Sequence, residues 1–159
     1  MTKPESSTDN PGIKFPPPLI FFLTGLAGWL LGKTTGWLVF LPGLALEIGA
    51  FSLLAIGFLL FFWSMLPFLV NKTSALPWTA DSKLLVGGPY RFSRNPMYAS
   101  MALLYLGISL QLGSGIAIIL LVPVIFIMNQ YVIKGEEAYL TRTFGEEYRN
   151  YQQKVRRWL

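Results

Sequence analysis

The sequence predicts an all-α membrane protein of about four transmembrane helices, followed by an amphipathic C-terminal helix on the cytoplasmic side. Hydrophobic residues make up 53% of the 159-residue chain and charged residues only 13%, whereas a soluble domain has about 25% charged residues. Long apolar runs recur between residues 16 and 132. Each approaches the roughly 20 residues with which a helix crosses about 30 Å of hydrocarbon.

The N-terminal part predicts a tail and two spans. Residues 1–15 are polar, so we expect a flexible tail ahead of a single membrane domain of residues 16–159. The first apolar run predicts a span of about 18–40. Because more apolar segments follow it, we interpret it as a membrane helix and not as a cleavable signal peptide. The pair Pro42-Gly43 breaks the next apolar stretch, which places the second span at about 44–66.

The middle of the chain predicts a loop and a helical hairpin. Residues 71–95 are polar and contain Pro and Gly, so we expect a cytoplasmic loop. A third span follows at about 96–112. The small residues 113–115 predict a tight reversal into a fourth span at about 116–133, so these two helices should be antiparallel neighbours.

The C-terminal residues 136–158 predict an amphipathic helix, with Lys134 at the exit from the membrane. Its apolar and aromatic side chains recur every three or four residues, as expected of a helix that lies on the membrane or on the preceding loop. These side chains are Leu140, Phe144, Tyr148, Tyr151, Val155 and Trp158.

The distribution of basic residues predicts the orientation. Of the 13 Lys and Arg residues, 12 fall in the tail, in residues 71–95 or after residue 133, and four crossings place these segments on one side. The positive-inside rule makes that side cytoplasmic, in a bacterial inner membrane. The basic residues border apolar spans, so anionic lipid headgroups are the expected partner rather than nucleic acid.

The composition also limits the chemistry. The chain has no Cys and no His, which excludes disulfides, thiolate metal sites and the commonest general base. We therefore predict no metal site. Any reaction must depend on carboxylates, Arg, Lys, Tyr or a bound cofactor.

Two polar clusters lie where the predicted hairpin brings helix ends together. The first, residues 88–98, reads G-P-Y-R-F-S-R-N-P-M-Y. Asn95 suits an N-cap, and Arg91 and Arg94 add positive charge, so the cluster could hold a carboxylate or a phosphate. The second cluster contains the pair Glu136-Glu137, which could bind a cation, accept hydrogen bonds from ribose or pair with the arginines. The same residues also suit topology anchors and a solvated first helical turn.

The two clusters, in this order and at this separation, resemble the isoprenylcysteine carboxyl methyltransferase and phospholipid methyltransferase superfamily of integral membrane enzymes. The resemblance covers about residues 84–159. It implies S-adenosylmethionine as cofactor and a lipophilic or small methyl acceptor. Many members have His at the position of Asn95, and Asn cannot titrate.

The resemblance also implies site residues. It gives cofactor contacts to Gly88, Pro89, Tyr90, Asn95, Glu136 and Glu137, to which the positive charge of Arg91 adds a further one. We predict catalytic roles for Arg94, Glu137 and Tyr98, whose ring could face the sulfonium.

Two other functions stay open on the sequence alone. Sterol and steroid reductases, which use NADPH, have a similar R-x-P-x-Y element near their last helices, so an NADPH-dependent membrane reductase is one alternative. A non-enzymatic membrane scaffold is the other. The sequence identifies neither the methyl acceptor nor an oligomeric state.

Overall fold

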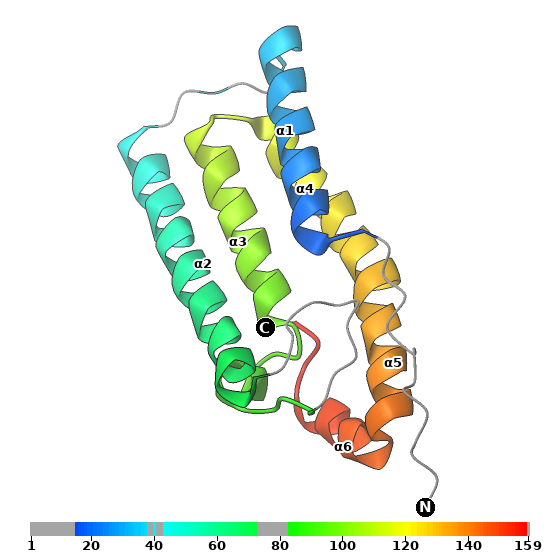
Figure 1. Cartoon of the computed structure of the whole chain (residues 1–159). Helices are drawn as coiled ribbons and strands as arrows, with labels where there is room; N and C mark the ends of the chain where they lie inside the picture. Colours follow the sequence, from blue (N-terminus) through cyan, green and yellow to red (C-terminus); the bar gives the residue numbers. More distant parts are fainter. Residues whose placement is uncertain (1–14, 38–39, 41–42, 73–82, 159) are drawn as a thin grey trace, which may run out of the picture.

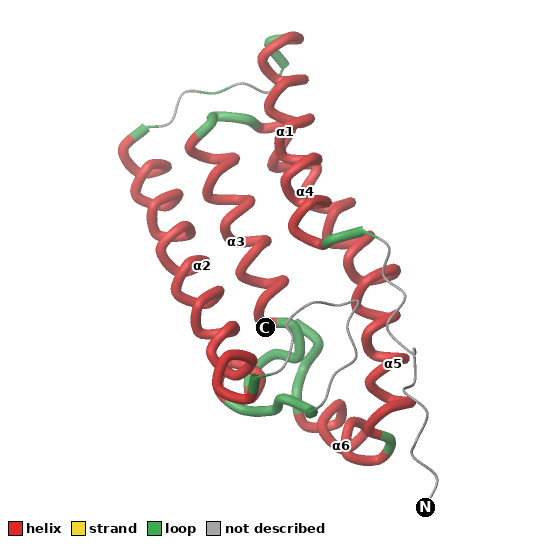
Figure 2. The backbone as a smooth tube through the Cα atoms, viewed as in Figure 1, coloured by secondary structure: helices red, strands yellow, loops and turns green. Residues whose placement is uncertain are grey.

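The computed structural model of the chain describes residues 15–37, 40, 43–72 and 83–158. These residues form helices and connecting segments, without a β-strand (Figure 2). The helices are α1 (Pro17–Thr35), α2 (Leu44–Asn71), η1 (Gly88–Arg91), α3 (Pro96–Gln111), α4 (Gly115–Ile127), η2 (Met128–Ile133), α5 (Lys134–Phe144) and α6 (Glu146–Lys154). The predicted all-α class is confirmed.

Two long helical segments of the described chain have the length and composition of membrane spans. They are Leu44–Asn71 and Gly115–Phe144, the latter comprising α4, η2 and α5. Only 11% and 28% of their apolar windows are buried inside the protein, so most of these side chains face outward. Exposed examples are Phe51, Leu59, Phe62, Val122 and Phe126. Such a surface is unfavourable in water and favourable in lipid, which makes the chain a membrane protein.

The helices form two packed pairs that meet at α3. The helix α2 packs mainly on α3, and α1 packs mainly on α4, while α3 also contacts α1 and α4 (Figure 1). Small residues permit the close approach of α2 and α3, as is usual between membrane helices. A Cβ atom at Gly57 would lie 2.9 Å from Leu104 Cγ, and one at Gly107 would lie 2.9 Å from Leu54 Cγ.

The chain reverses between α3 and α4 at the residues where the sequence predicted the turn. Gly113 has φ +62°, a conformation that glycine adopts at little cost. The Ser114 amide donates to the carbonyl of Ser109 at 3.0 Å, and the Ser114 hydroxyl accepts from the amide of Ala117 at 3.3 Å. This N-cap starts α4 immediately after α3 ends.

Two predicted boundaries in the first half were wrong. The span predicted at 18–40 is helical only over Pro17–Thr35 and ends at Gly36, which has φ +66°. The span predicted at 44–66 does start at Leu44 but continues to Asn71, with Pro67 inside the helix. The predicted tail falls almost entirely on residues 1–14, and part of the predicted loop on residues 73–82, which lie outside the described residues.

The predicted helices at 116–133 and 136–158 were also divided wrongly. The helix continues without a break through Lys134 to Phe144, because the change from apolar to polar side chains marks the membrane boundary but leaves the backbone hydrogen bonds intact. At about 1.5 Å per residue this helix exceeds the hydrocarbon thickness, so its last turns lie outside it. The break comes at Gly145, and α6 ends at Lys154.

Gly145 offers a direct test of the α5–α6 corner. Its φ of 53° and ψ of −124° belong to a region that L-residues rarely occupy. We expect Gly145→Ala to lower the free energy of unfolding by about 1 to 3 kcal/mol, measured by thermal unfolding in detergent. The control is Gly87→Ala, because Gly87 has φ −93° and open space around it. Equal stability of the two variants would contradict this assignment of strain.

Candidate active site

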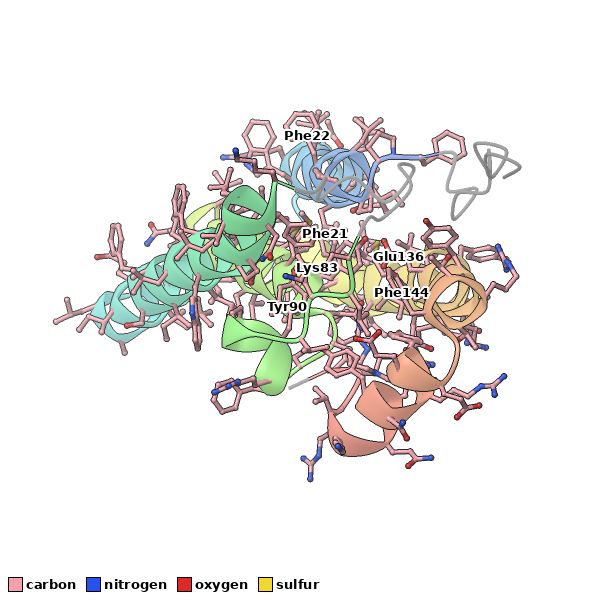
Figure 3. The ribbon with its side chains drawn as sticks, turned by 60° about the horizontal axis from the view of Figure 1, so that its bottom comes forward. Phe21, Phe22, Lys83, Tyr90, Glu136 and Phe144 are labelled. Atoms are coloured by element: carbon pink, nitrogen blue, oxygen red, sulfur yellow. The ribbon has the colours of Figure 1, made fainter. Side chains whose placement is uncertain are left out.

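The polar residues of the chain meet at the end of the bundle where α3 begins. The hairpin brings the segment before α3 beside α5, and the C-terminal segment (residues 155–158) returns to the same place (Figure 1). Figure 3 views this end and shows Lys83, Tyr90 and Glu136 pointing toward its centre, whereas Phe22 of α1 points away from it. The two clusters singled out in the sequence therefore share one site.

Glu137 is the centre of the ion-pair cluster (Arg94, Glu137 and Arg157). Arg94 Nη2 lies 3.0 Å from Glu137 Oε1. Arg157 donates through Nε to Oε1 at 3.0 Å and through Nη2 to Oε2 at 2.6 Å. These hydrogen bonds raise the pKa of Arg157 above its ordinary value. One carboxylate therefore balances two arginines, with side-chain exposures of 12% for Glu137 and 11% for Arg94.

Glu136 contacts α3. The Tyr98 hydroxyl donates a short hydrogen bond to Glu136 Oε1. Tyr98 is buried in the main core cluster with residues such as Phe21 and Met128. The adjacent acids Glu136 and Glu137 therefore contact different partners.

A π-helical segment precedes the two acids. The helix η2, Met128–Ile133, lies between the α-helical turns of α4 and α5. A π-turn contains more residues than an α-turn, so it rotates the following side chains around the helix axis. It also places Asn129, which accepts a hydrogen bond from Arg157 Nη1 at 3.2 Å. No pattern in the sequence predicted this segment.

The sequence predicted that the side chain of Asn95 caps α3. Asn95 does occupy the N-cap position, but its side chain forms no hydrogen bond that caps the helix. Its Nδ2 atom donates to the carbonyl of Arg157 at 2.9 Å. The Ser93 hydroxyl donates to the same carbonyl at 3.3 Å. The side chain that was expected to cap α3 instead binds the C-terminal segment.

Tyrosine residues line the cavity beside the ion-pair cluster. Burial, followed by the nearby Glu137, raises the pKa of Tyr148 above its ordinary value. Burial raises the pKa of Tyr151 to about 12, against a smaller lowering effect of Arg94. Both hydroxyls thus remain protonated at neutral pH, and that of Tyr151 donates to the carbonyl of Tyr90 at 2.7 Å.

The cavity has a volume of about 80 Å³. Its lining includes Tyr90, Arg94, Asn95, Glu136, Glu137 and Leu140. Arg94 Nε is buried within the protein without a hydrogen-bond partner, although buried donors are nearly always satisfied. The volume is below the roughly 300–1,000 Å³ of a small-molecule pocket, so it suits the charged end of a larger ligand.

The structure separates the predicted site residues into two groups. Tyr90, Arg94, Asn95, Glu136 and Glu137 line the cavity, and Tyr98 contacts Glu136. The other three do not line it: Arg91 and Gly88 are exposed, and Pro89 is buried.

Sequence reasoning missed the contributions of Arg157, Tyr148 and Tyr151 to the site. The two tyrosines follow the helical period and were assigned to the apolar face of an amphipathic helix. Arg157 lies at 20 residues from its partner Glu137, beyond the range of any helical period.

The fold and this site define a helical membrane protein with a buried carboxylate–arginine cluster at one end of its bundle. Comparison with known families then identifies the family to which the chain belongs. The chain belongs to the phospholipid methyltransferase family, whose model matches residues 45–147, more than half of the chain. The chain is therefore a membrane methyltransferase, and the superfamily that the two motifs resemble is confirmed.

Two relatives match parts of the chain. A Haemophilus influenzae protein described as uncharacterised is 48% identical over 63 residues, which are 40% of this chain and 100% of that protein. The protein-S-isoprenylcysteine O-methyltransferase of Schizosaccharomyces pombe is 33% identical over 75 residues, which are 47% of this chain. The match covers 32% of the yeast enzyme. No solved structure matches the chain.

Proposed function

We propose that the protein transfers a methyl group from S-adenosylmethionine to a lipophilic acceptor at the cytoplasmic face of a bacterial inner membrane. The observation that carries the proposal is the ion-pair cluster at the start of α3, within a chain of the phospholipid methyltransferase family. Burial of a charged group costs free energy unless the group forms an ion pair, and such groups cluster at functional sites. A buried cluster beside a cavity is therefore a candidate binding site.

The residues of the cavity fit the charged end of this cofactor. The Arg94 guanidinium, which lines the cavity, would donate to its carboxylate. Glu136 and Glu137 would accept hydrogen bonds from its ammonium group or ribose hydroxyls. The small cavity suits the amino-acid end, so the nucleoside would extend beyond the volume that the described residues enclose. When bound, the cofactor supplies a methyl group on a sulfonium cation.

The remaining chemistry requires little acid–base catalysis from the chain. Because the sulfonium charge disappears during transfer, alignment of the acceptor and exclusion of water are the main contributions of the protein. A carboxylate or thiolate acceptor needs no base. An amine acceptor must lose a proton when it is methylated, and we assign Glu136 as the base that accepts this proton. The Tyr98 hydroxyl orients the Glu136 carboxylate. Asn95 cannot take that role because an amide does not titrate.

We further propose that the chain crosses the membrane four times. The crossings would be α1, α2, α3 and the apolar part of Gly115–Phe144. With this count the N-terminus, residues 71–95 and the C-terminus share one side, which carries 12 of the 13 basic residues. The positive-inside rule supports a cytoplasmic location for that side and for the site. Residues 16–159 would form one domain.

An apolar cavity between α1 and α3 supports a lipophilic acceptor. Its volume is about 360 Å³, and its lining includes Phe22, Gly25, Met101, Tyr105, Ile108 and Ser109. Two polar groups on its wall are already bonded: the Tyr105 hydroxyl donates to the carbonyl of Ala117, and the Ser109 hydroxyl donates to the carbonyl of Tyr105, both at 2.8 Å. The cavity therefore suits hydrocarbon. Met101, which lines this cavity, lies one helical turn after Tyr98, the residue that contacts Glu136.

Filling this cavity should impair acceptor use and spare the cofactor. A Cβ atom at Gly25 would lie 3.2 Å from the Tyr105 ring, so a larger side chain there enters the cavity. We expect Gly25→Leu to reduce methyl transfer to a long-chain acceptor by about tenfold or more, with unchanged cofactor affinity by calorimetry. Gly49→Leu is the control, because nothing lies within 4 Å of its Cβ position. Full activity of Gly25→Leu would remove this cavity from the acceptor path.

The decisive experiment identifies the methylated product. Membranes that contain the protein are incubated with an isotopically labelled methyl donor, and the lipids and small metabolites are analysed by mass spectrometry. We expect labelled product with the wild type and none with Glu137→Gln. Calorimetry on the purified protein should give micromolar affinity for S-adenosylmethionine. Binding of NADPH instead would favour a membrane reductase, and binding of neither would favour a non-enzymatic scaffold.

A further inference from the structure

The C-terminal segment closes the site by binding the residues that precede α3. After α6 ends at Lys154, the chain turns back and forms an isolated parallel bridge between Arg156 and Ser93. The amide of Arg94 donates to the carbonyl of Arg156 at 2.8 Å. Trp158 packs against the main core cluster. Residues 155–158 are thus attached on both sides of Arg157.

This attachment delivers the Arg157 side chain to Glu137. The guanidinium group binds both carboxylate oxygens, at 3.0 and 2.6 Å, and it also donates to Asn129. Two parallel hydrogen bonds fix the plane of a carboxylate as well as its position. Arg94 approaches Glu137 through Nη2, and its Nε has no hydrogen-bond partner. Arg157 therefore sets the orientation of Glu137.

We propose that Arg157 is a positioning residue that holds Glu137 in the orientation required to bind the methyl donor. This inference rests on the function proposed above. Arg157 lines no part of the cavity, so it acts through Glu137 and not by contact with the ligand. The C-terminal segment is then a structural part of the site and not only the end of a surface helix.

The neighbouring arginine provides a matched control. Arg156 contributes its carbonyl to the contact with Arg94, but its side chain is exposed. The variants are Arg157→Gln, Arg157→Lys and Arg156→Gln. For each one, calorimetry measures the affinity for S-adenosylhomocysteine, the demethylated cofactor, and thermal unfolding without ligand measures stability.

We expect Arg157→Gln to weaken binding by about 10-fold to 100-fold, the usual effect of losing hydrogen bonds to a charged group. Arg157→Lys keeps the charge and should recover part of the affinity, and Arg156→Gln should bind like the wild type. Equal binding by Arg157→Gln and the wild type would overturn the inference. Early unfolding of both Arg157 variants with equal loss of binding would also overturn it, in favour of a purely structural role. If the wild type itself fails to bind, the proposed function fails first.

Discussion

Glu137→Gln should lose both cofactor binding and stability, because it removes the one carboxylate that balances two arginines. Arg94 and Arg157 would remain close together, and Arg94 is 11% exposed. Removal of one partner from a buried ion pair costs about 3 to 5 kcal/mol. We expect a loss near the lower end of this range, since Arg157 is 31% exposed and can turn toward water. Chemical or thermal unfolding in detergent measures it.

The same substitution on the surface serves as the control. Glu146 forms an ion pair with Arg149, and their side chains are 77% and 57% exposed. A surface pair of this kind contributes at most about 1 kcal/mol, so Glu146→Gln should unfold close to the wild type. If Glu137→Gln and Glu146→Gln unfold alike, the ion-pair cluster does not stabilise this end of the protein.

The effect on binding is separable from the effect on stability. At a temperature where Glu137→Gln remains folded, we expect its affinity for S-adenosylhomocysteine to fall by about 100-fold. Glutamine keeps the shape of the side chain but cannot attract an ammonium group or hold both arginines. An unchanged dissociation constant in the folded variant would exclude Glu137 from the cofactor site.

The general architecture was predictable because apolar length is a local property of the sequence. The apolar residues after Leu44 and the reversal at Gly113 required no knowledge of distant contacts. Helix ends were less predictable. Lys134 marks a change in polarity, but the helix continues for ten further residues to Phe144. Hydrogen bonds within a helix do not depend on whether its side chains face lipid or water.

The site was predictable only in part, for a related reason. The contact between Arg94 and Glu137 follows from a hairpin of two adjacent helices, so the motif order was sufficient to anticipate it. The contact between Arg157 and Glu137 depends on a corner at Gly145 and on the return of residues 155–158. The role of Asn95 was misjudged because an N-cap position predicts a local hydrogen bond, whereas its amide donates to the distant Arg157 carbonyl.

Gly28→Val should destabilise the protein strongly at the opposite end of the bundle. Gly28 lies where α1 crosses the start of α4, and a Cβ atom there would lie 2.7 Å from Ala117 Cα and 2.9 Å from Ala117 N. These are backbone atoms, so no rotamer change can relieve the contact and the helices must separate. Separation would also break the hydrogen bond from the Ser114 hydroxyl to the Gly28 carbonyl, at 3.2 Å. We expect a loss of about 2 to 3 kcal/mol.

Gly49→Val is the control, because nothing lies within 4 Å of a Cβ atom at Gly49. It measures the cost of placing valine in a membrane helix without a steric contact between helices. Unfolding of both variants in detergent or nanodiscs provides the comparison, and equal midpoints would contradict close packing of α1 on α4. Gly28 is remote from the start of α3, so folded Gly28→Val should keep the affinity of the wild type for S-adenosylhomocysteine. Glu137→Gln should lose affinity and stability together, whereas Gly28→Val should lose stability alone. That contrast assigns binding to one end of the bundle and helix packing to the other.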